Sequence, residues 1–223
     1  RTNYTAAHLG TDSRPETIIE KALTQPSEFD LAKQHCIRIS QAGHPDTFGF
    51  FVGGALVDHV IRDCHHYRAS GRGKLRQGRY STIIRVFQLG VLGLLRRVGY
   101  RSPTMHIRAE KLGEMKGRVR LLVVTTLDKH QVTVHPYLPR GEGAVKLTAI
   151  TRDAKDFWFQ LIGLLRGREQ TTLTPGNGYF SGAANDFCVT GLAGICVDGQ
   201  EYDLKPDFET RISTGPAYRF VSS

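Results

Sequence analysis

Short apolar stretches with turn signals between them dominate the second half of the chain. Met105, Ile107 and Ala109 alternate with polar residues, and residues 119–127 form a long β-branched run. Further strands are predicted over 131–138, 144–150, 170–173, 186–190, 193–197, 209–213 and 218–221. Strands in series, without a helix after each one, predict an antiparallel sandwich or barrel rather than a parallel α/β sheet.

The first half of the chain mixes strands and helices. Residues 34–40 and 47–52 are predicted strands, and the Gly53-Gly54 pair is expected to end the second strand. A helix is then predicted from Ala55 through Ile61. Such a strand, glycine pair and helix start can expose backbone N–H groups to an anion.

Three further helices are predicted. The first starts near Pro15 and ends at Pro26, and the second covers 80–98, where Arg85, Arg96 and Arg97 keep the apolar run too short for a membrane span. In the third, Asp153 caps residues 154–165, and one side is expected to hold a set of apolar side chains. These are Phe157, Trp158, Leu161, Ile162 and Leu165.

Charge and cysteine content narrow the class of protein. A net charge of +9 favours an anionic partner. Nucleic acid is not expected, because neither the aromatic and basic strand pattern of RNA-binding sheets nor a helix-turn-helix pattern occurs. The four cysteines have no paired short spacing, which indicates buried thiols in a cytoplasmic protein rather than a disulfide framework.

An Asp-Gly pair, Asp198-Gly199, stands between two extended segments and predicts a β-hairpin turn. At the other end of the chain, Thr2-Asn3 is followed by Thr5-Ala6-Ala7 and Leu9-Gly10. Together these two segments resemble the diacylglycerol kinase and sphingosine kinase family of lipid kinases. That family carries a Gly-Thr-x-Asn-Asp-Phe-Ala-like segment and, in a β-rich lobe, an Asp-Gly-Glu turn.

The resemblance implies a fold and a domain organisation. Residues 1–30 would be the tail of an N-terminal nucleotide-binding lobe with its connecting helix, and 31–223 a C-terminal domain. This domain is expected to be mainly β (α+β), an antiparallel β-sandwich with a few helices. The nucleotide lobe of the family carries a Gly-Gly-Asp-Gly-Thr loop, which this sequence lacks, so that lobe is expected upstream as a missing partner.

The resemblance also implies a chemistry: ATP-dependent phosphoryl transfer, with Mg²⁺, to a lipid hydroxyl of the diacylglycerol or sphingoid type. Asp198 is the candidate metal-linked carboxylate, Gln200 and Glu201 are the candidates beside the reacting hydroxyl, and Thr2 and Asn3 are candidates for nucleotide contact. Two family acids are replaced, since Gln200 stands where Glu is expected and Tyr4 where Asp is expected. A Gln amide can orient a hydroxyl but cannot accept its proton. Activity is therefore expected to be weakened or to use another base.

An alternative interpretation is a catalytically silent β-sandwich that binds anionic lipid. Its candidate contacts lie in a basic, glycine-containing segment, at Arg72, Lys74, Arg76 and Arg79. In either case we expect a protein that is peripheral at the membrane. A homodimer is also possible, because the exposed edge strands of a sheet can pair with a second copy of the chain.

Overall fold

The computed structural model describes residues 23–24, 30–69, 100–127, 137–165 and 171–222. Its strands are β1 (Asp30–Gln41), β2 (Thr47–Gly49), β3 (Phe51–Ala55), β4 (Thr104–Ala109), β5 (Gly113–Thr125), β6 (Val145–Thr151), β7 (Tyr179–Ala184), β8 (Asp186–Thr190), β9 (Gly194–Val197), β10 (Gln200–Asp203) and β11 (Thr210–Ser222). The helices are α3 (Leu56–Ala69), α5 (Phe157–Leu165) and the short 3₁₀ turn η2 (Pro175–Asn177).

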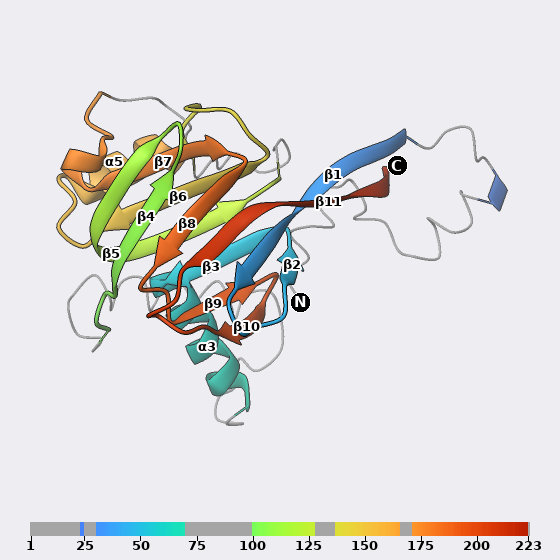
Figure 1. The fold of residues 1–223 in the computed structure, drawn as a ribbon, viewed down its shortest axis with the longest axis horizontal. Helices are drawn as coiled ribbons and strands as arrows, with labels where there is room; N and C mark the ends of the chain where they lie inside the picture. Colours follow the sequence, from blue (N-terminus) through green and yellow to red (C-terminus); the bar gives the residue numbers. More distant parts are fainter. Residues whose placement is uncertain (1–22, 25–29, 70–99, 128–136, 166–170, 223) are drawn as a thin grey trace.

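The strands form a single curled sheet in which neighbouring strands are antiparallel (Figure 1). Strand β5 joins its two halves. The first part of β5 pairs with β4, which continues through β8, β11 and β1 to β2. The second part pairs with β6 on one side and with β3 on the other, and β3 continues through β9 to β10. The predicted mainly β, antiparallel fold is confirmed.

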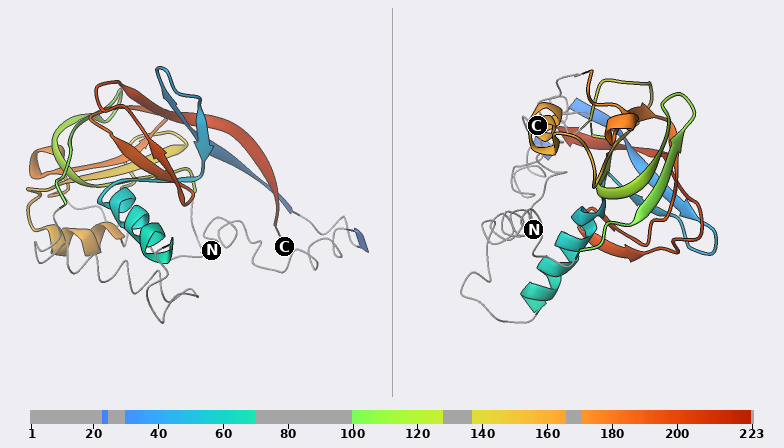
Figure 2. Two further views of the ribbon diagram at one scale, coloured as in Figure 1. Left: turned by 90° about the horizontal axis from the view of Figure 1, so that it is seen from below. Right: turned by 90° about the vertical axis from the view of Figure 1, so that its left-hand side faces the viewer.

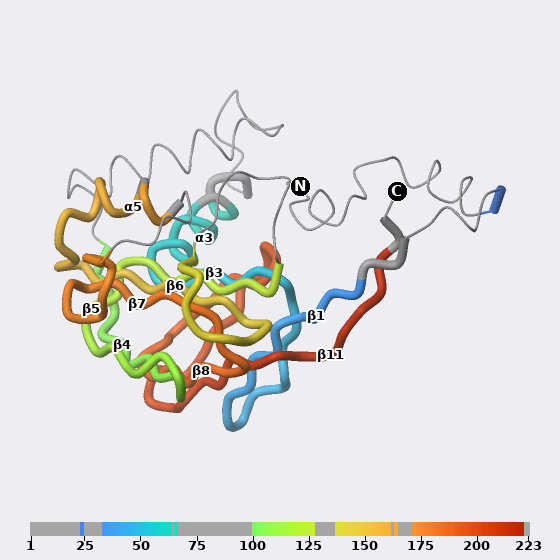
Figure 3. The backbone as a smooth tube through the Cα atoms, turned by 90° about the horizontal axis from the view of Figure 1, so that it is seen from above, coloured from blue at the N-terminus to red at the C-terminus, as the bar shows by residue number. Residues whose placement is uncertain are grey.

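The main core lies between the two halves of the sheet. It combines Ile37 of β1, Val52 of β3, Leu122 of β5 and Phe187 of β8, all fully buried. A second, smaller core lies under α5 and contains Ile150, Leu164 and Leu173. Helices α3 and α5 lie on the same outer side of the molecule (Figure 2 and Figure 3).

The Gly53-Gly54 pair lies inside strand β3, so the prediction that it ends the strand is wrong. Gly53 pairs with Val123 of β5 and with Cys196 of β9, and Gly54 pairs with Leu122 and Ile195. A Cβ atom on Gly53 would lie 2.3 Å from Val57 Cγ1. Glycine is therefore required for close approach of α3, and the backbone that was expected to be open to an anion is engaged in the sheet.

Helix α5 starts later than predicted, at Phe157 rather than Ala154. Residues 152–156 form turns, and Asp156 adopts a left-handed φ of 50°. Among the residues of the predicted apolar face whose burial is described, Trp158 is wrong, since it is 53% exposed. Gln160, Gly163 and Leu164 are buried, and Leu161 and Phe157 are partly buried.

The end of the chain also differs from the prediction. One long strand, β11, replaces the two strands expected over 209–213 and 218–221, because Gly215-Pro216 is accommodated within its pairing to β1. No strand forms over 171–173, and strand β7 was not predicted. The strand expected over 131–138 and the helices expected over 15–26 and 80–98 lie largely or wholly outside the described residues.

Within the described ranges, no helix has both the length and the apolar character needed to cross a membrane. The domain boundary predicted near residue 30 stays a prediction, since residues 1–22 and 25–29 lie outside the described part of the chain.

Candidate functional site

The Asp-Gly pair forms the predicted hairpin turn between β9 and β10. Val197 pairs with Gln200 across a two-residue loop, and both loop residues have positive φ, 47° at Asp198 and 88° at Gly199. This is the geometry of a type I′ turn, in which Asp and Gly are favoured at these positions. The tip, from Asp198 through Gln200, is exposed.

The carboxylate of Asp198 holds the hairpin to the junction between β2 and β3. Its Oδ2 accepts a hydrogen bond from the backbone N–H of Phe50, and its Oδ1 accepts one from Phe51, each at 2.9 Å. The N–H of Asp198 in turn donates to the carbonyl of Phe51 at 2.9 Å. Residues 50 and 51 are where the chain passes from one half of the sheet to the other, so Asp198 fixes that crossing.

Burial of the carboxylate raises the pKa of Asp198, and the two N–H donors offset part of this rise. The residue as a whole is exposed, but its oxygens point inward to the backbone. The close approach of β2 to the hairpin also explains why residue 49 is a glycine. A Cβ atom there would lie 2.3 Å from Val197 Cγ1 and 2.8 Å from Asp198 Oδ2. Glycine at this position lets β2 reach the hairpin.

Gln200 and Glu201 point to opposite faces of β10, as neighbouring strand residues do. The hydroxyl of Tyr202 donates a 2.9 Å hydrogen bond to Gln200 Oε1 on one face. On the other face, Glu201 Oε1 lies 2.6 Å from His65 Nδ1. The structure therefore places Glu201 against α3, and Glu201 does not take the position of Gln200 without rebuilding the turn.

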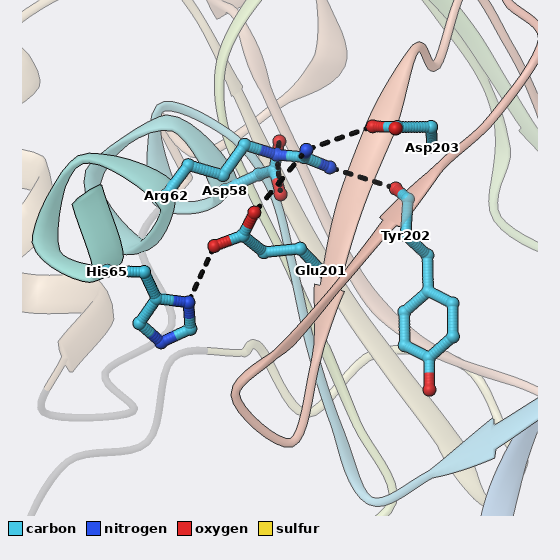
Figure 4. A network of polar contacts seen from close by, with 6 residues as sticks. All are labelled: Asp58, Arg62, His65, Glu201, Tyr202 and Asp203. Atoms are coloured by element: carbon cyan, nitrogen blue, oxygen red, sulfur yellow. Dashed lines mark hydrogen bonds and ion pairs between the residues drawn. The ribbon is translucent and has the colours of Figure 1, made fainter. Parts of the chain in front are cut away.

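Helix α3 carries a polar stripe that lies along the hairpin (Figure 4). Asp58, Arg62 and His65 occupy positions i, i+4 and i+7, which share one side of a helix. Arg62 Nε donates to both carboxylate oxygens of Asp58 at 2.9 and 3.0 Å, and Nη1 lies 2.9 Å from Asp203 Oδ1. The same side chain donates to the carbonyl of Tyr202 at 3.0 Å.

This network places three carboxylates around one guanidinium. Arg62 Nη1 also lies 3.6 Å from Glu201 Oε2, so Arg62 contacts Asp58, Glu201 and Asp203 together. Burial raises the pKa of Asp58, while its hydrogen bonds and attraction to Arg62 act in the opposite direction. The guanidinium of Arg62 thus offsets the cost of burying the Asp58 carboxylate, and it links α3 to β10.

Several predicted site residues are not placed by the structure. Thr2 and Asn3, the predicted nucleotide contacts, lie outside the described residues. So do Tyr4 and the four basic residues Arg72, Lys74, Arg76 and Arg79. Their roles stay predictions, and of the predicted set the structure brings together only Asp198, Gln200 and Glu201.

Sequence reasoning missed Asp58, Arg62 and His65. Their helical spacing was visible in the sequence, since an acidic and a basic residue four apart on a helix commonly pair. Their contact with Glu201 and Asp203, more than 130 residues away, was not visible. It follows from the packing of α3 against β3, β5 and β9, since β10 pairs with β9.

The structure does not test Asp198 as a magnesium ligand. Among the described residues, no three His, Cys, Asp or Glu side chains are grouped so that they could hold a metal ion. Magnesium prefers oxygen ligands, and both oxygens of Asp198 already accept backbone hydrogen bonds. Asp198 as a metal ligand stays a prediction, and it would need further ligands from elsewhere in the protein.

Comparison with known proteins gives a fold likeness and no sequence family. No family model matches the chain, and no curated protein is similar to it. Three solved structures from Bacillus anthracis str. Sterne resemble it. Two are assigned as diacylglycerol kinase, with 14% identity and a TM-score of 0.49 for one and 13% and 0.48 for the other. The third, also of diacylglycerol kinase, has 10% identity and a TM-score of 0.45.

These similarities cover most of this chain and a smaller share of the others. They include 93%, 93% and 94% of this chain, but 61%, 61% and 60% of the three structures. The chain thus spans about three fifths of the length of these kinases.

Proposed function

We propose that this chain is the lipid-side lobe of a lipid kinase-like phosphotransferase, acting on the hydroxyl of a diacylglycerol or sphingoid lipid with ATP and Mg²⁺. The observation that supports the proposal is the Asp198 corner, by which we mean the turn of Asp198 and Gly199 held against Phe50 and Phe51. An Asp-Gly turn of the kind found in lipid kinases forms an exposed hairpin tip, and the Asp carboxylate holds that tip at the junction between β2 and β3.

In this proposal Asp198 has a positioning role. Because its two oxygens hold the N–H groups of Phe50 and Phe51, it fixes the tip in one orientation and leaves Gln200 projecting beside Tyr202. The Gln200 amide would orient the lipid hydroxyl by hydrogen bonding, without accepting its proton. ATP supplies the phosphoryl group when it is bound, and it would be held by residues other than those described.

The experiment is a phosphoryl-transfer assay of the full-length protein with ATP, Mg²⁺ and either diacylglycerol or a sphingoid base. We expect transfer of the γ-phosphate to lipid at a low rate. Gln200→Glu is expected to raise turnover by about 100-fold, which is the usual gain from a positioned general base. Asp198→Asn is expected to lower it. Robust wild-type turnover that Asp198→Asn leaves unchanged would disprove this assignment of the site.

A second candidate function is a catalytically silent module that binds anionic lipid. One observation favours it: the residue at the exposed tip is Gln200, which has no useful basicity, and the neighbouring Glu201 is engaged by His65 and Arg62. The same assay separates the two functions. No transfer to any lipid by either the wild type or Gln200→Glu, with lipid binding retained, supports the silent module.

A further inference from the structure

Helix α5 exposes large aromatic side chains that the fold does not use. The side chains of Phe159 and Trp158, which are neighbours in the chain, are 72% and 53% exposed. The opposite side of the helix is well packed, with Leu164 and Gln160 buried. The exposed pair therefore does not result from loose packing. Two neighbouring exposed aromatics on one helix indicate a surface for an apolar partner.

Cationic side chains surround the start of this helix. The guanidinium of Arg120 lies over the ring of Phe157, 4.8 Å from its centroid, and the Phe157 ring meets Trp158 edge-on at 4.9 Å. Arg120 Nη2 also donates to the carbonyl of Arg152 at 3.3 Å. These contacts place Arg120 and the backbone of Arg152 beside Phe157 and Trp158.

We define the α5 face as the exposed aromatic pair Trp158 and Phe159 of the helix, together with the cationic residues of β5 and of the turns before the helix, Arg118, Arg120, Arg152 and Lys155. It includes two nearby acids, of which Asp153 lies 3.3 Å from Arg118 and Asp156 stands just before the helix. Four cations against two carboxylates leave the face basic. The helix itself has no charged residue, and Arg166, Arg168 and Glu169 follow it in the sequence.

We propose that the α5 face docks the protein on an anionic lipid bilayer, with α5 lying in the plane of the interface. A nine-residue helix is too short to span a bilayer. Trp and Phe side chains favour the boundary between headgroups and acyl chains, and Lys and Arg favour anionic headgroups. The face combines both chemistries. It would also place a lipid kinase-like lobe against its substrate, although docking does not depend on catalysis.

A direct test is available because Trp158 is the only tryptophan in the chain. The 223-residue chain is mixed, without ATP, with vesicles of phosphatidylcholine alone or of equal parts phosphatidylcholine and phosphatidylglycerol. We expect co-sedimentation with the anionic vesicles and a blue shift of the Trp158 emission. Brominated acyl chains should quench that emission. High salt should weaken binding, because it screens the cationic contacts.

Matched variants separate the aromatic and charged parts of the face. Phe159→Ser should weaken vesicle binding by about tenfold, since it removes the most exposed apolar side chain of the α5 face. The control is Phe208→Ser, because Phe208 is another exposed phenylalanine beside a cation, 5.4 Å from Lys205 Nζ, in a different part of the molecule. Binding by this variant should match the wild type.

The double variant Arg152→Gln with Lys155→Gln should weaken binding to anionic vesicles by at least about fivefold. The control is Lys33→Gln with Arg219→Gln, which removes two exposed charges from the paired strands β1 and β11. Circular dichroism confirms that each variant is folded. Equal losses in the test and control pairs would show that net charge alone drives binding, which would overturn the proposal.

Other outcomes would also overturn it. Sedimentation with vesicles without any change in Trp158 emission would place the contact on another surface. Concentration-dependent self-association that Phe159→Ser abolishes would assign the face to a second copy of the chain. Because no ATP is present, absence of vesicle binding would disprove this docking surface without affecting the proposed phosphoryl transfer, which short-chain soluble lipids can test separately.

Discussion

The two helices of the described structure are held in different ways. Helix α3 buries Val60 and approaches Gly53 closely at Val57, and it also faces the sheet through charges. Asp58 and Arg62 pair on the helix, and Arg62 and His65 reach Glu201 and Asp203 of β10 (Figure 4). Helix α5 has no charged residue and packs through Leu164 and its neighbours. It also exposes Trp158 and Phe159 to solvent.

This difference indicates different roles for two helices on the same side of the molecule (Figure 2). A helix fixed by directional ion pairs along its length keeps a hairpin in place, because those contacts specify one position. A helix fixed by nonpolar packing on one side, with nonpolar groups left on the other, has a surface available for a partner. We therefore associate α3 with the Asp198 corner and α5 with docking.

The largest expected effect is in the core beneath α5. Leu164→Ala should lower the free energy of unfolding by about 3 kcal/mol, since Leu164 is buried among Ile150, Leu173 and Tyr179 and the truncation leaves a cavity. Urea unfolding followed by circular dichroism measures it. A loss below about 1 kcal/mol would show that α5 is only loosely held, and the contrast with α3 would then fail.

Arg62→Ala tests the ion pairs of α3. The free energy of unfolding should fall by about 2 kcal/mol at neutral pH, because Asp58 loses its partner while staying buried. This value is below the full cost of breaking a buried ion pair, because the Arg62 side chain is a quarter exposed. Arg62→Lys, which keeps the charge but not the two-pronged geometry, is the control and should cost less. Equal costs would mean that geometry, not charge, is what matters.

The cost of Arg62→Ala should depend on pH. Burial raises the pKa of Asp58 in the folded state above its value in the unfolded chain. The folded state therefore binds this proton more tightly, and the resulting stability is present in acid and lost as pH rises through the folded-state pKa. Urea titrations at about pH 4.5 and at pH 7 should show the smaller cost in acid. A cost that is larger in acid would contradict this account of Asp58.

Asp198→Asn tests the hairpin that α3 holds. Asn tolerates the left-handed φ of this position, but its amide offers one acceptor to the two N–H groups of Phe50 and Phe51. We expect a loss of about 1 kcal/mol, measured by urea unfolding. Asp207→Asn, at an exposed turn, is the control and should change nothing. Unaltered stability of Asp198→Asn would show that the carboxylate does not fix the corner.

The smallest expected effect is that of Phe159→Ser on stability. Because Phe159 is mostly exposed, the free energy of unfolding should change by less than about 0.5 kcal/mol. Thermal unfolding measured beside Leu164→Ala gives the sharpest contrast between the two sides of α5. A large loss in Phe159→Ser would show that the residue is structural, and the vesicle experiments with this variant would need reinterpretation.

Some features could be predicted because they depend on local chemistry. The alternation of residues 105–109, the apolar run of 119–127 and the Asp198-Gly199 turn each favour a backbone shape through neighbouring residues. The first and third are present in the structure, and the second forms a strand that begins earlier, at Gly113, and ends at Thr125. In α5 the prediction was less accurate. Phe157, Trp158 and Phe159 are consecutive and point about 100° apart around the helix, so they cannot all face the core.

The sequence by itself determined an antiparallel, mainly β chain with a hairpin at Asp198-Gly199, since strand periodicity and turn preference act over a few residues. Only the tertiary structure decided that the Asp198 carboxylate holds Phe50 and Phe51, that Glu201 faces His65, and that Phe159 faces outward. These facts depend on which surfaces pack together across more than a hundred residues. Local preferences do not encode that choice, because burial and pairing are settled by the whole fold.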